Sequence, residues 1–451
     1  MVRNTSIWNA LFDEPPNVFS MLDLPFTEFQ MLLYRSSFMV NEYVFNSTDV
    51  QNFLKSNHKI DLVISELFSN EALYMFAHKY QSPLVLVTTF GNSLKGNYFS
   101  RNPLQLSTLY HEYGRTAEPL SFIGRLYNLY ICAYDIIMIK YWYMPKQEEY
   151  VKKYLKDLPE PVPSLEEMAS NSSLILMNSH YSIDTPAAYL PNFIEVGGLH
   201  ITESNTSLPK DLQIILDTAK NGVVFLSLGS NVRTCEMTKE KLKAFLTVFG
   251  ELKQTVLMKW ENTSMPAVPK NVILRTWFPQ REILRHPNIK LFIGHGGLLG
   301  LQETIIAGVP ILGIPVFGDQ YLNLLNVREN GHGELIEYKD ITEDKLRTLI
   351  NKLLNDKSYS IKAKEIALRF QDRPMSPIET AIWWIEYVIR HKGAEFLKTP
   401  ALKMNFLAYN DIDVYLFLAV VLYLSVHFIW KVIVYAKRTF KVKATKKQKK
   451  F

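Results

Sequence analysis

Short apolar runs separated by polar and glycine-rich stretches recur along most of the chain. Apolar runs of about four to eight residues bounded by turn residues are typical of buried strands, and the stretches between them are long enough for helices. The predicted strands are residues 61–65, 84–88, 174–177, 193–196, 223–228, 291–293 and 309–316. This alternation predicts an α/β fold.

The chain is too long for one typical domain. A glycine pair at 197–198, followed by a polar run to Asp211, predicts a linker between two α/β domains. We assign residues 1–196 to the first domain, 197–218 to the linker and 219–375 to the second domain.

A long apolar segment lies near the carboxyl end, where residues 414–436 contain a single charge, Lys431. These 23 residues would span about 35 Å as a helix, enough to cross a bilayer core. A buried core helix is the alternative, but the flanking residues 437–451 hold eight lysines and arginines and no acid. We therefore predict a transmembrane helix at 414–436 and a basic cytosolic tail at 437–451.

The charge balance changes once this tail is set apart. The whole chain carries a formal charge of +6, but residues 1–430 sum to −3. No basic stripe with interleaved aromatics occurs there, which argues against nucleic acid as a partner. The two cysteines, Cys132 and Cys235, form neither a disulfide framework nor a metal-ligand cluster.

Residues 120–143 form a second apolar segment, with only Arg125, Asp135 and Lys140 charged. This composition fits a core helix, and a surface helix that leans on a membrane is the alternative.

Candidate chemistry gathers between Trp277 and Gln320. The strand at 291–293 breaks at Gly294-His295-Gly296-Gly297 before a helical run, and the strand at 309–316 stops at Gly318-Asp319-Gln320. Open α/β sheets bind ligands at the carboxyl ends of their strands. A glycine turn that opens a helix is a ready site for a phosphate or diphosphate, although such glycines also serve tight turns.

Other polar residues of this region extend the predicted site. Glu303 lies two helical turns beyond His295, on a face that they can share, where its carboxylate suits a ribose diol. The competing interpretations are a core position for Trp277 and ordinary turn chemistry for Asp319-Gln320.

These residues, with Phe225-Leu-Ser-Leu-Gly-Ser230, Val196-Gly-Gly-Leu-His200, Arg373-Pro-Met-Ser-Pro377 and the run from Trp384 to Ala394, resemble the UDP-glycosyltransferases. The resemblance is to the animal membrane-bound UDP-glucuronosyltransferase and UDP-glucosyltransferase type, and it covers nearly the whole chain. It implies the GT-B fold, in which two Rossmann-like domains face a cleft. It also implies that a helix at 376–398 crosses back to the first domain.

The resemblance implies a role for each matching residue. Trp277 would stack on the uracil, while Gln280 and the Phe278 backbone would read its edge and the ribose. Glu303 would accept from the ribose hydroxyls, and Asp319 and Gln320 would face the sugar. The diphosphate would lie against the glycine turn and the start of the helix. The residues of this part of the site would be Ser230, His295, Gly296, Gly297 and Gly300. We expect no metal and no cofactor, because the UDP-sugar is a co-substrate.

Two positions depart from the family pattern. Gly294 stands where the animal enzymes usually carry Thr or Ser, and Leu299 stands where many carry Asn. Both changes remove polar groups that would serve the diphosphate.

Inverting transfer requires a base that takes the proton of the acceptor hydroxyl. In the family this base is a histidine after the first strand, and its carboxylate partner falls here on Glu66, where the vertebrate enzymes carry Asp. Glu71 is a less favoured substitute. His58, the one histidine before Glu66, reads as a solvated turn residue. With no apolar signal region at the start, we expect that an amino-terminal segment with the base is missing from this sequence.

The favoured function is transfer of glucose or glucuronate from a UDP-sugar to a hydroxyl of a small lipophilic acceptor. The first alternative is a non-catalytic UDP-binding relative that modulates active members, as part of a homo- or hetero-oligomer. A nicotinamide-type dinucleotide-binding protein is disfavoured, because no Gly-x-Gly-x-x-Gly follows an early strand.

The expected location is the endoplasmic reticulum membrane, with the body lumenal. The lysines three and five places from the end of Lys447-Gln-Lys-Lys-Phe451 resemble a dilysine-type retrieval signal. Five glycosylation sequons are compatible with a lumenal body, namely Asn4, Asn46, Asn171, Asn205 and Asn262.

Overall fold

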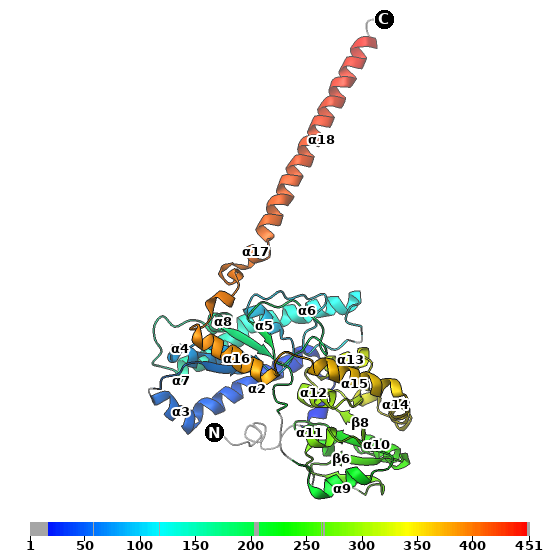
Figure 1. The fold of residues 1–451 in the computed structure, drawn as a ribbon. Helices are drawn as coiled ribbons and strands as arrows, with labels where there is room; N and C mark the ends of the chain where they lie inside the picture. The colour runs from blue at the N-terminus through cyan, green and yellow to red at the C-terminus, as the bar shows by residue number, and fades with distance from the viewer. Residues whose placement is uncertain are drawn as a thin grey trace. The chain divides into compact units, whose positions relative to one another are not determined.

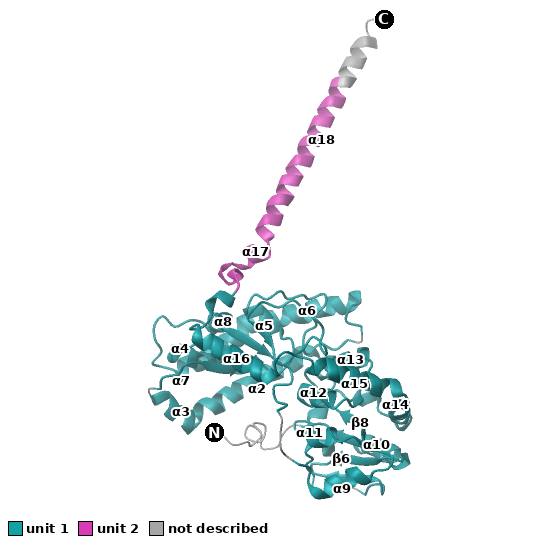
Figure 2. Cartoon of the chain, viewed as in Figure 1, with its two compact units in different colours: residues 1–398 teal, residues 399–451 magenta. Residues whose placement is uncertain are grey.

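The computed structural model describes residues 17–448 except 57, 117, 203–206, 263 and 265–266, with side chains to residue 439. Asn4, Asn205 and the end of the basic tail lie outside the described residues. The chain divides into two compact units, residues 1–398 and 399–451 (Figure 2). Each unit is described by itself.

The first sheet contains four parallel strands in the order β1-β2-β3-β4. They are β1 (Val63–Glu66), β2 (Leu84–Thr88), β3 (Leu174–Met177) and β4 (Phe193–Glu195). Each begins within two residues of its predicted start. The central strands β2 and β3 are almost fully buried, as continuous apolar runs of a parallel sheet should be, whereas Ile64 of the edge strand β1 is exposed. The surrounding helical elements are α2 (Phe26–Asn46), α3 (Thr48–Lys55), η2 (Glu71–Tyr74), α4 (Met75–Lys79), α5 (Leu94–Phe99), α6 (Phe122–Met138), η3 (Ile139–Tyr143), α7 (Met144–Tyr154) and α8 (Leu165–Ser170).

The second sheet contains six parallel strands in the order β10-β9-β8-β5-β6-β7. They are β5 (Val223–Ser227), β6 (Thr255–Lys259), β7 (Val272–Arg275), β8 (Ile289–Gly294), β9 (Ile311–Gly313) and β10 (Gly333–Leu335). The strand predicted at 309–316 is thus only three residues long, and its remainder is extended loop. The sequence order reverses between β8 and β5, which is the switch point where such sheets bind ligands.

Helices cover both faces of the second sheet (Figure 1). They are α9 (Lys210–Thr218), α10 (Lys239–Glu251), α11 (Gln280–Leu284), α12 (Leu298–Ile306), α13 (Gln320–Glu329), α14 (Glu343–Asn355) and α15 (Lys357–Gln371). Leu212 and Leu216 of α9 are buried in the core of this lobe. The second half of the predicted linker 197–218 is therefore a helix of the second lobe, because its polar residues alternate with apolar ones at helical spacing.

Both ends of the first unit cross between the two sheets. The helix α16 (Pro377–Arg390) buries Ala381 and Val388 in the same core as Val85 of the first sheet. Conversely, the short helix η1 (Val18–Met21) packs Phe19 against Tyr338 of the second lobe, with ring centroids 4.5 Å apart. No sequence pattern predicted this second crossing.

The helix α6 combines a polar inner face with an apolar outer face. Asn128 is buried and donates to the carbonyls of Leu106 and Leu109, both at 2.9 Å, and buried Asp135 accepts from Tyr34 and His111. The exposed side chains of α6 include Phe122, Ile123, Leu126, Leu129, Tyr130 and Ile137. This segment is therefore not a core helix that is buried on all its faces.

The second unit is helical. It contains η7 (Pro400–Lys403), α17 (Phe406–Tyr409) and α18 (Ile412–Gln448). Residues 412–439 are long and apolar enough to cross a membrane, and none of the most apolar window is buried. By the same measure of length and composition, residues 122–154 also qualify, but a third of that window is buried.

Candidate functional site

Five neighbouring strands of the second sheet end around one cavity of about 740 Å³. Loops after β9, β8, β5 and β7, and the last residue of β6, bring together side chains that are far apart in the sequence. Ten of the eleven predicted donor-site residues line this cavity, namely Ser230, Trp277, Phe278, Gln280, His295, Gly297, Gly300, Glu303, Asp319 and Gln320.

The eleventh residue, Gly296, does not line the cavity. Its φ is +85°, and a Cβ there would meet the Leu324 side chain at 2.5 Å. Its backbone shape and its close contact with α13 both require glycine. The donor role of Gly296 thus remains a prediction. Only its backbone would take part, because glycine has no side chain.

Two other glycines fit around the His295 ring. A Cβ on Gly229 would lie 2.7 Å from Cε1 of His295, and a Cβ on Gly297 would lie 2.5 Å from its Nε2. Gly229 also has a φ of +82°. The two turns after β5 and β8 therefore close on the imidazole and leave no room for other side chains.

Burial and the charge of nearby Lys259 lower the pKa of His295 to about 4. At neutral pH this histidine is uncharged, so it acts as a hydrogen-bonding group. In this state the imidazole itself adds no positive charge to the cavity.

Two cationic side chains, Lys259 and Arg281, line the cavity, and the sequence analysis identified neither. Lys259 lies at its inner end. Its Nζ donates to the Gly229 carbonyl at 2.6 Å and lies 5.4 Å from the centroid of the Trp277 ring. The available signal was a lysine at the end of a buried strand, β6, next to β5 in the sheet. The start of α12, capped by Gly297 without a side-chain hydrogen bond, adds free backbone N–H groups.

The aromatic pair after β7 divides its roles. Trp277 is 69% exposed and lines the cavity, so the core interpretation of this residue is wrong. Phe278 is 3% exposed and packs its ring against Phe225, leaving only its backbone for a ligand.

A hydrogen bond joins two of the residues predicted to contact the nucleoside. Nε2 of Gln280 donates to Oε2 of Glu303 at 2.8 Å. Burial raises the pKa of Glu303 above its usual value. His295 precedes α12 and Glu303 lies within it, so they meet at the cavity although they do not share a helix face.

At the other end of the cavity, Asp319 and Gln320 begin α13. The Asp319 carboxylate accepts from Nδ2 of Asn323 at 2.7 Å, and burial raises its pKa to about 6. Oε1 of Gln320 accepts from the backbone of Val316 and Phe317, at 2.8 and 3.1 Å. Only the amide nitrogen of Gln320 is then left for a ligand.

The structure explains one departure from the family pattern. A Cβ on Gly294 would meet the Phe292 ring at 2.5 Å, so this ring occupies the room that Ser or Thr would need. Leu299 lines the cavity with an apolar side chain, and its carbonyl lies 3.1 Å from Nε2 of His200.

The acidic residues of the first lobe have separate surroundings. Glu66 ends β1 and accepts from Oγ1 of Thr89 at 2.7 Å, while burial raises its pKa. Glu71 is buried, pairs with Nζ of Lys95 at 2.6 Å and accepts from Tyr143, so it is committed to the core. His58 is exposed beside Phe53.

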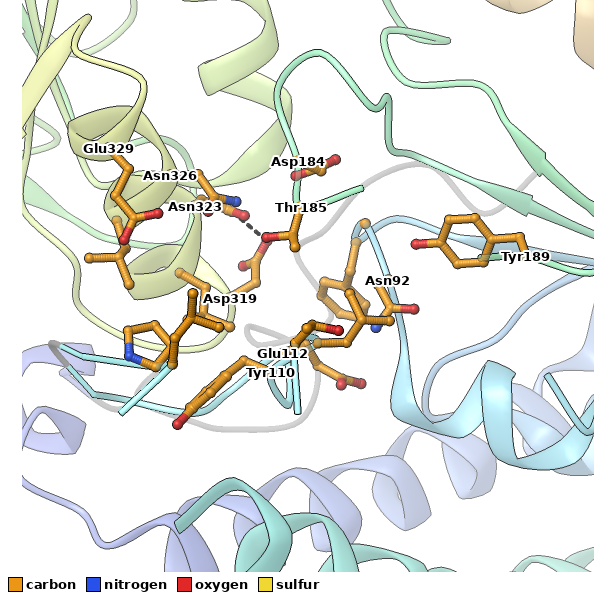
Figure 3. A pocket seen from close by; sticks show the side chains of 18 residues that line it. Asn92, Tyr110, Glu112, Asp184, Thr185, Tyr189, Asp319, Asn323, Asn326 and Glu329 are labelled. Atoms are coloured by element: carbon orange, nitrogen blue, oxygen red, sulfur yellow. Dashed lines mark hydrogen bonds between the residues drawn. The ribbon is translucent and has the colours of Figure 1, made fainter. Parts of the chain in front are cut away.

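A second cavity, of about 210 Å³, adjoins the first and shares Phe90 and Asp319 with it (Figure 3). The first lobe supplies Tyr110, Glu112 and Asp184, and α13 supplies the opposite wall. The sequence analysis did not identify these carboxylates.

Comparisons with known proteins agree on one family. The family described as "UDP-glucoronosyl and UDP-glucosyl transferase" matches residues 26–449. UDP-glycosyltransferase UGT5 of Dactylopius coccus is 34% identical over 437 residues, which cover 93% of this chain and 80% of that protein. UDP-glucuronosyltransferase 2B1 of Rattus norvegicus is 29% identical over 346 residues, which cover 76% of this chain and 64% of that protein.

Solved structures share the fold at low sequence identity. The glycosyltransferase VinC in complex with DTDP has a TM-score of 0.56 at 18% identity and covers 86% of each chain. The glycotransferase of kitacinnamycin has a TM-score of 0.54 at 14% identity, covering 82% of this chain and 84% of that one. The fold is therefore GT-B, as predicted.

Proposed function

Because the chain belongs to the UDP-glucuronosyl and UDP-glucosyl transferase family, we propose that it transfers glucose or glucuronate from a UDP-sugar to a hydroxyl of a small lipophilic acceptor. The observation that carries the proposal is the gathering of ten predicted donor residues around one cavity.

In this proposal the donor lies along the rim of the second sheet. Uracil stacks on the exposed Trp277 ring, and the ribose hydroxyls donate to Glu303. The diphosphate accepts from the start of α12 and lies near Lys259, which stabilises the charge that develops as the bond to the sugar breaks. The sugar then lies at Asp319 and Gln320, where the two cavities meet.

The transfer conserves atoms and charge in one displacement. The acceptor oxygen attacks the anomeric carbon, and the bond from that carbon to the diphosphate oxygen breaks with its electron pair leaving on UDP. The acceptor proton passes to a base, for which the family resemblance gives a histidine supported by Glu66. UDP-sugar is a co-substrate, and no cofactor or metal takes part in this proposal.

The second candidate is UDP binding without transfer, in a chain that modulates active relatives as a homo- or hetero-oligomer. It is favoured because Glu66, the predicted partner of the base histidine, accepts its side-chain hydrogen bond from a threonine, Thr89. Among the described histidines, His295 alone lines either cavity, and it lies on the diphosphate side.

We also propose that α18 anchors the chain in the endoplasmic reticulum membrane, with the body lumenal and the basic tail cytosolic. The length and apolar composition of residues 412–439 support the anchor. The excess of lysine and arginine after residue 437 supports the orientation.

Calorimetric titration of the full chain in detergent with UDP tests the donor site. Trp277→Ala and Glu303→Ala should each weaken UDP binding about tenfold or more, because each removes a stacking surface or a charged acceptor. Trp383→Ala, on α16, is the control and should bind UDP normally. Unchanged affinity in both cavity variants contradicts the proposal.

Product formation from UDP-glucose and UDP-glucuronate, measured on the same preparation, separates the two candidates. Turnover with either donor supports transfer, whereas UDP binding without product supports the second candidate.

A further inference from the structure

The cavity beside the donor site is strongly acidic (Figure 3). Glu112, Asp184 and Asp319 line it, and exposed Glu329 lies at its edge. Among the described residues, no lysine, arginine or histidine lines it. The cavity shares Asp319 and Phe90 with the donor cavity, so its contents lie next to the transferred sugar in the proposed function.

The three carboxylates are held by neutral donors. Glu112 accepts from the Leu94 backbone at 3.1 Å, and Asp184 accepts from the His180 backbone at 3.3 Å. Asp319 accepts from the Asn323 amide. In the part of the chain that the structure describes, none of the three pairs with a lysine or arginine. The one ion-pair contact is a 3.7 Å approach of Glu112 to Nδ1 of His111, which itself accepts from the Tyr113 backbone.

These carboxylates destabilise one another's charge. Burial, with the charges of Glu195 and Asp319, raises the pKa of Asp184 to about 7. Burial raises the pKa of Asp319 as well, and the charge of Glu112 adds to this effect. A cation in the cavity would relieve both effects, because an opposite charge favours the ionised carboxylate.

The walls suit an organic cation. Phe90, Tyr110 and Tyr189 line the cavity together with the carboxylates. Aromatic faces attract ammonium groups, and they also cover the apolar part of a ligand. A neutral polyol would use the asparagines of α13 but would leave the carboxylate charges uncompensated.

We propose that the acceptor is an amphiphilic amine, a small aromatic or aliphatic hydroxyl compound whose protonated nitrogen lies among Glu112, Asp184 and Asp319. This inference rests on the proposed function, which makes the cavity the acceptor site, and it narrows the acceptor from any lipophilic hydroxyl to a cationic one.

Three phenols of similar size provide the test. Tyramine is a cation at pH 7.5, 4-ethylphenol is neutral and 4-hydroxyphenylacetate is an anion. Each is titrated by calorimetry into the full chain in detergent, first saturated with UDP and then without UDP. Tyramine should bind about tenfold tighter than 4-ethylphenol, because a charge-assisted contact contributes that much. The anion should bind most weakly.

Matched variants assign the preference to the cavity. Asp184→Asn and Glu112→Gln should each weaken tyramine binding about tenfold and leave 4-ethylphenol within twofold. Both keep a hydrogen-bonding side chain, and neither residue lines the donor cavity, so unchanged UDP affinity shows that they fold. Glu118→Gln, an exposed carboxylate outside the lining, is the control for general charge.

Equal affinities for tyramine and 4-ethylphenol would overturn the inference. So would a loss of tyramine binding in Glu118→Gln equal to that in Asp184→Asn. Absence of UDP binding would instead refute the proposed function, and the titrations without UDP would still report the charge preference.

Discussion

The two adjoining cavities share Asp319 but differ in the charged side chains that line them. Lys259 and Arg281 line the donor cavity beside its carboxylates, together with the start of α12 and a neutral His295. Among the described residues, the second cavity is lined by carboxylates and by no lysine, arginine or histidine. A leaving diphosphate needs positive potential, and a protonated amine needs negative potential. Among the described residues, the cationic side chains therefore line the donor side of the site, and none lines the second cavity.

The cavities also differ in how the chain builds them. Most of the donor cavity comes from one stretch of sequence, Trp277 to Gln320, in which each loop follows a strand of the same sheet. The second cavity draws on loops after β2 and β3, on the segment between α5 and α6, and on α13 with its preceding Asp319. A change in one lobe should therefore affect one ligand more than the other.

The largest expected effect is the loss of the positive charge on the donor side. Lys259→Met should weaken UDP binding about tenfold to a hundredfold, because a contact to a charged group contributes about 1.5–3 kcal/mol. Uridine, which lacks the diphosphate, should bind within about threefold of the wild type. Calorimetric titration of both ligands measures the difference.

Lys259→Arg keeps the charge and is the control, with UDP affinity nearer to the wild type. A uniform loss of uridine and UDP affinity in Lys259→Met would show that the lysine only supports the fold, through its bond to the Gly229 carbonyl. Lys259 would then not count as a group that binds the diphosphate in the donor cavity.

A smaller effect is expected where the donor side departs from its family. Gly294→Ser should reduce the free energy of unfolding by about 1–3 kcal/mol, because its Cβ would overlap the Phe292 ring. Phe292→Val makes room, so the double variant should be more stable than the sum of the two single changes predicts, by about 1 kcal/mol. Urea unfolding of the full chain in detergent measures the cycle, and strict additivity would contradict the steric explanation.

Much of the fold was predictable because the strands are continuous apolar runs that only a doubly covered sheet can bury. The contact of η1 with the second lobe was not predictable. Phe19 and Tyr338 are more than 300 residues apart in the sequence, and no local pattern indicates such a contact. The residues of α9 were assigned to a linker because the polar run that leads into them was a stronger signal than their helical periodicity.

The donor site was predictable to the extent that its chemistry follows strand ends. Trp277, His295, Glu303 and Asp319 lie within one segment, and the sheet brings that segment to one edge. The charge states were not predictable, since the low pKa of His295 depends on burial and on Lys259, a residue from another strand. The carboxylates of the second cavity were not identified either, because they come from separate segments of the chain that only the fold brings together.

The acceptor side should show its charge in the pH dependence of stability. The pKa of Asp184 is about 7 in the folded chain and about 3.9 when unfolded. Between these values the folded state binds more protons, so its stability falls as the pH rises from about 4 to 7. Asp184→Asn removes this contribution.

Thermal unfolding between pH 4.5 and 7.5 checks the sign. At pH 7.5 Asp184→Asn should melt about 2–4 °C above the wild type, and the two should converge near pH 4.5. The slope should decrease without vanishing, because Asp319 titrates in the same direction. Glu118→Gln should follow the wild type, and an identical slope in Asp184→Asn would contradict an acidic, uncompensated cavity.

The smallest effect is expected where the first lobe touches the donor cavity. Thr89 lines that cavity, and its Oγ1 donates to Glu66. Thr89→Val should cost about 1 kcal/mol of stability through the lost hydrogen bond, while UDP affinity stays within about twofold because the second lobe makes the nucleotide contacts. Thr89→Ser should restore the stability. A tenfold loss of UDP affinity in Thr89→Val would mean that the first lobe shares in donor binding, and that the two cavities are one functional unit.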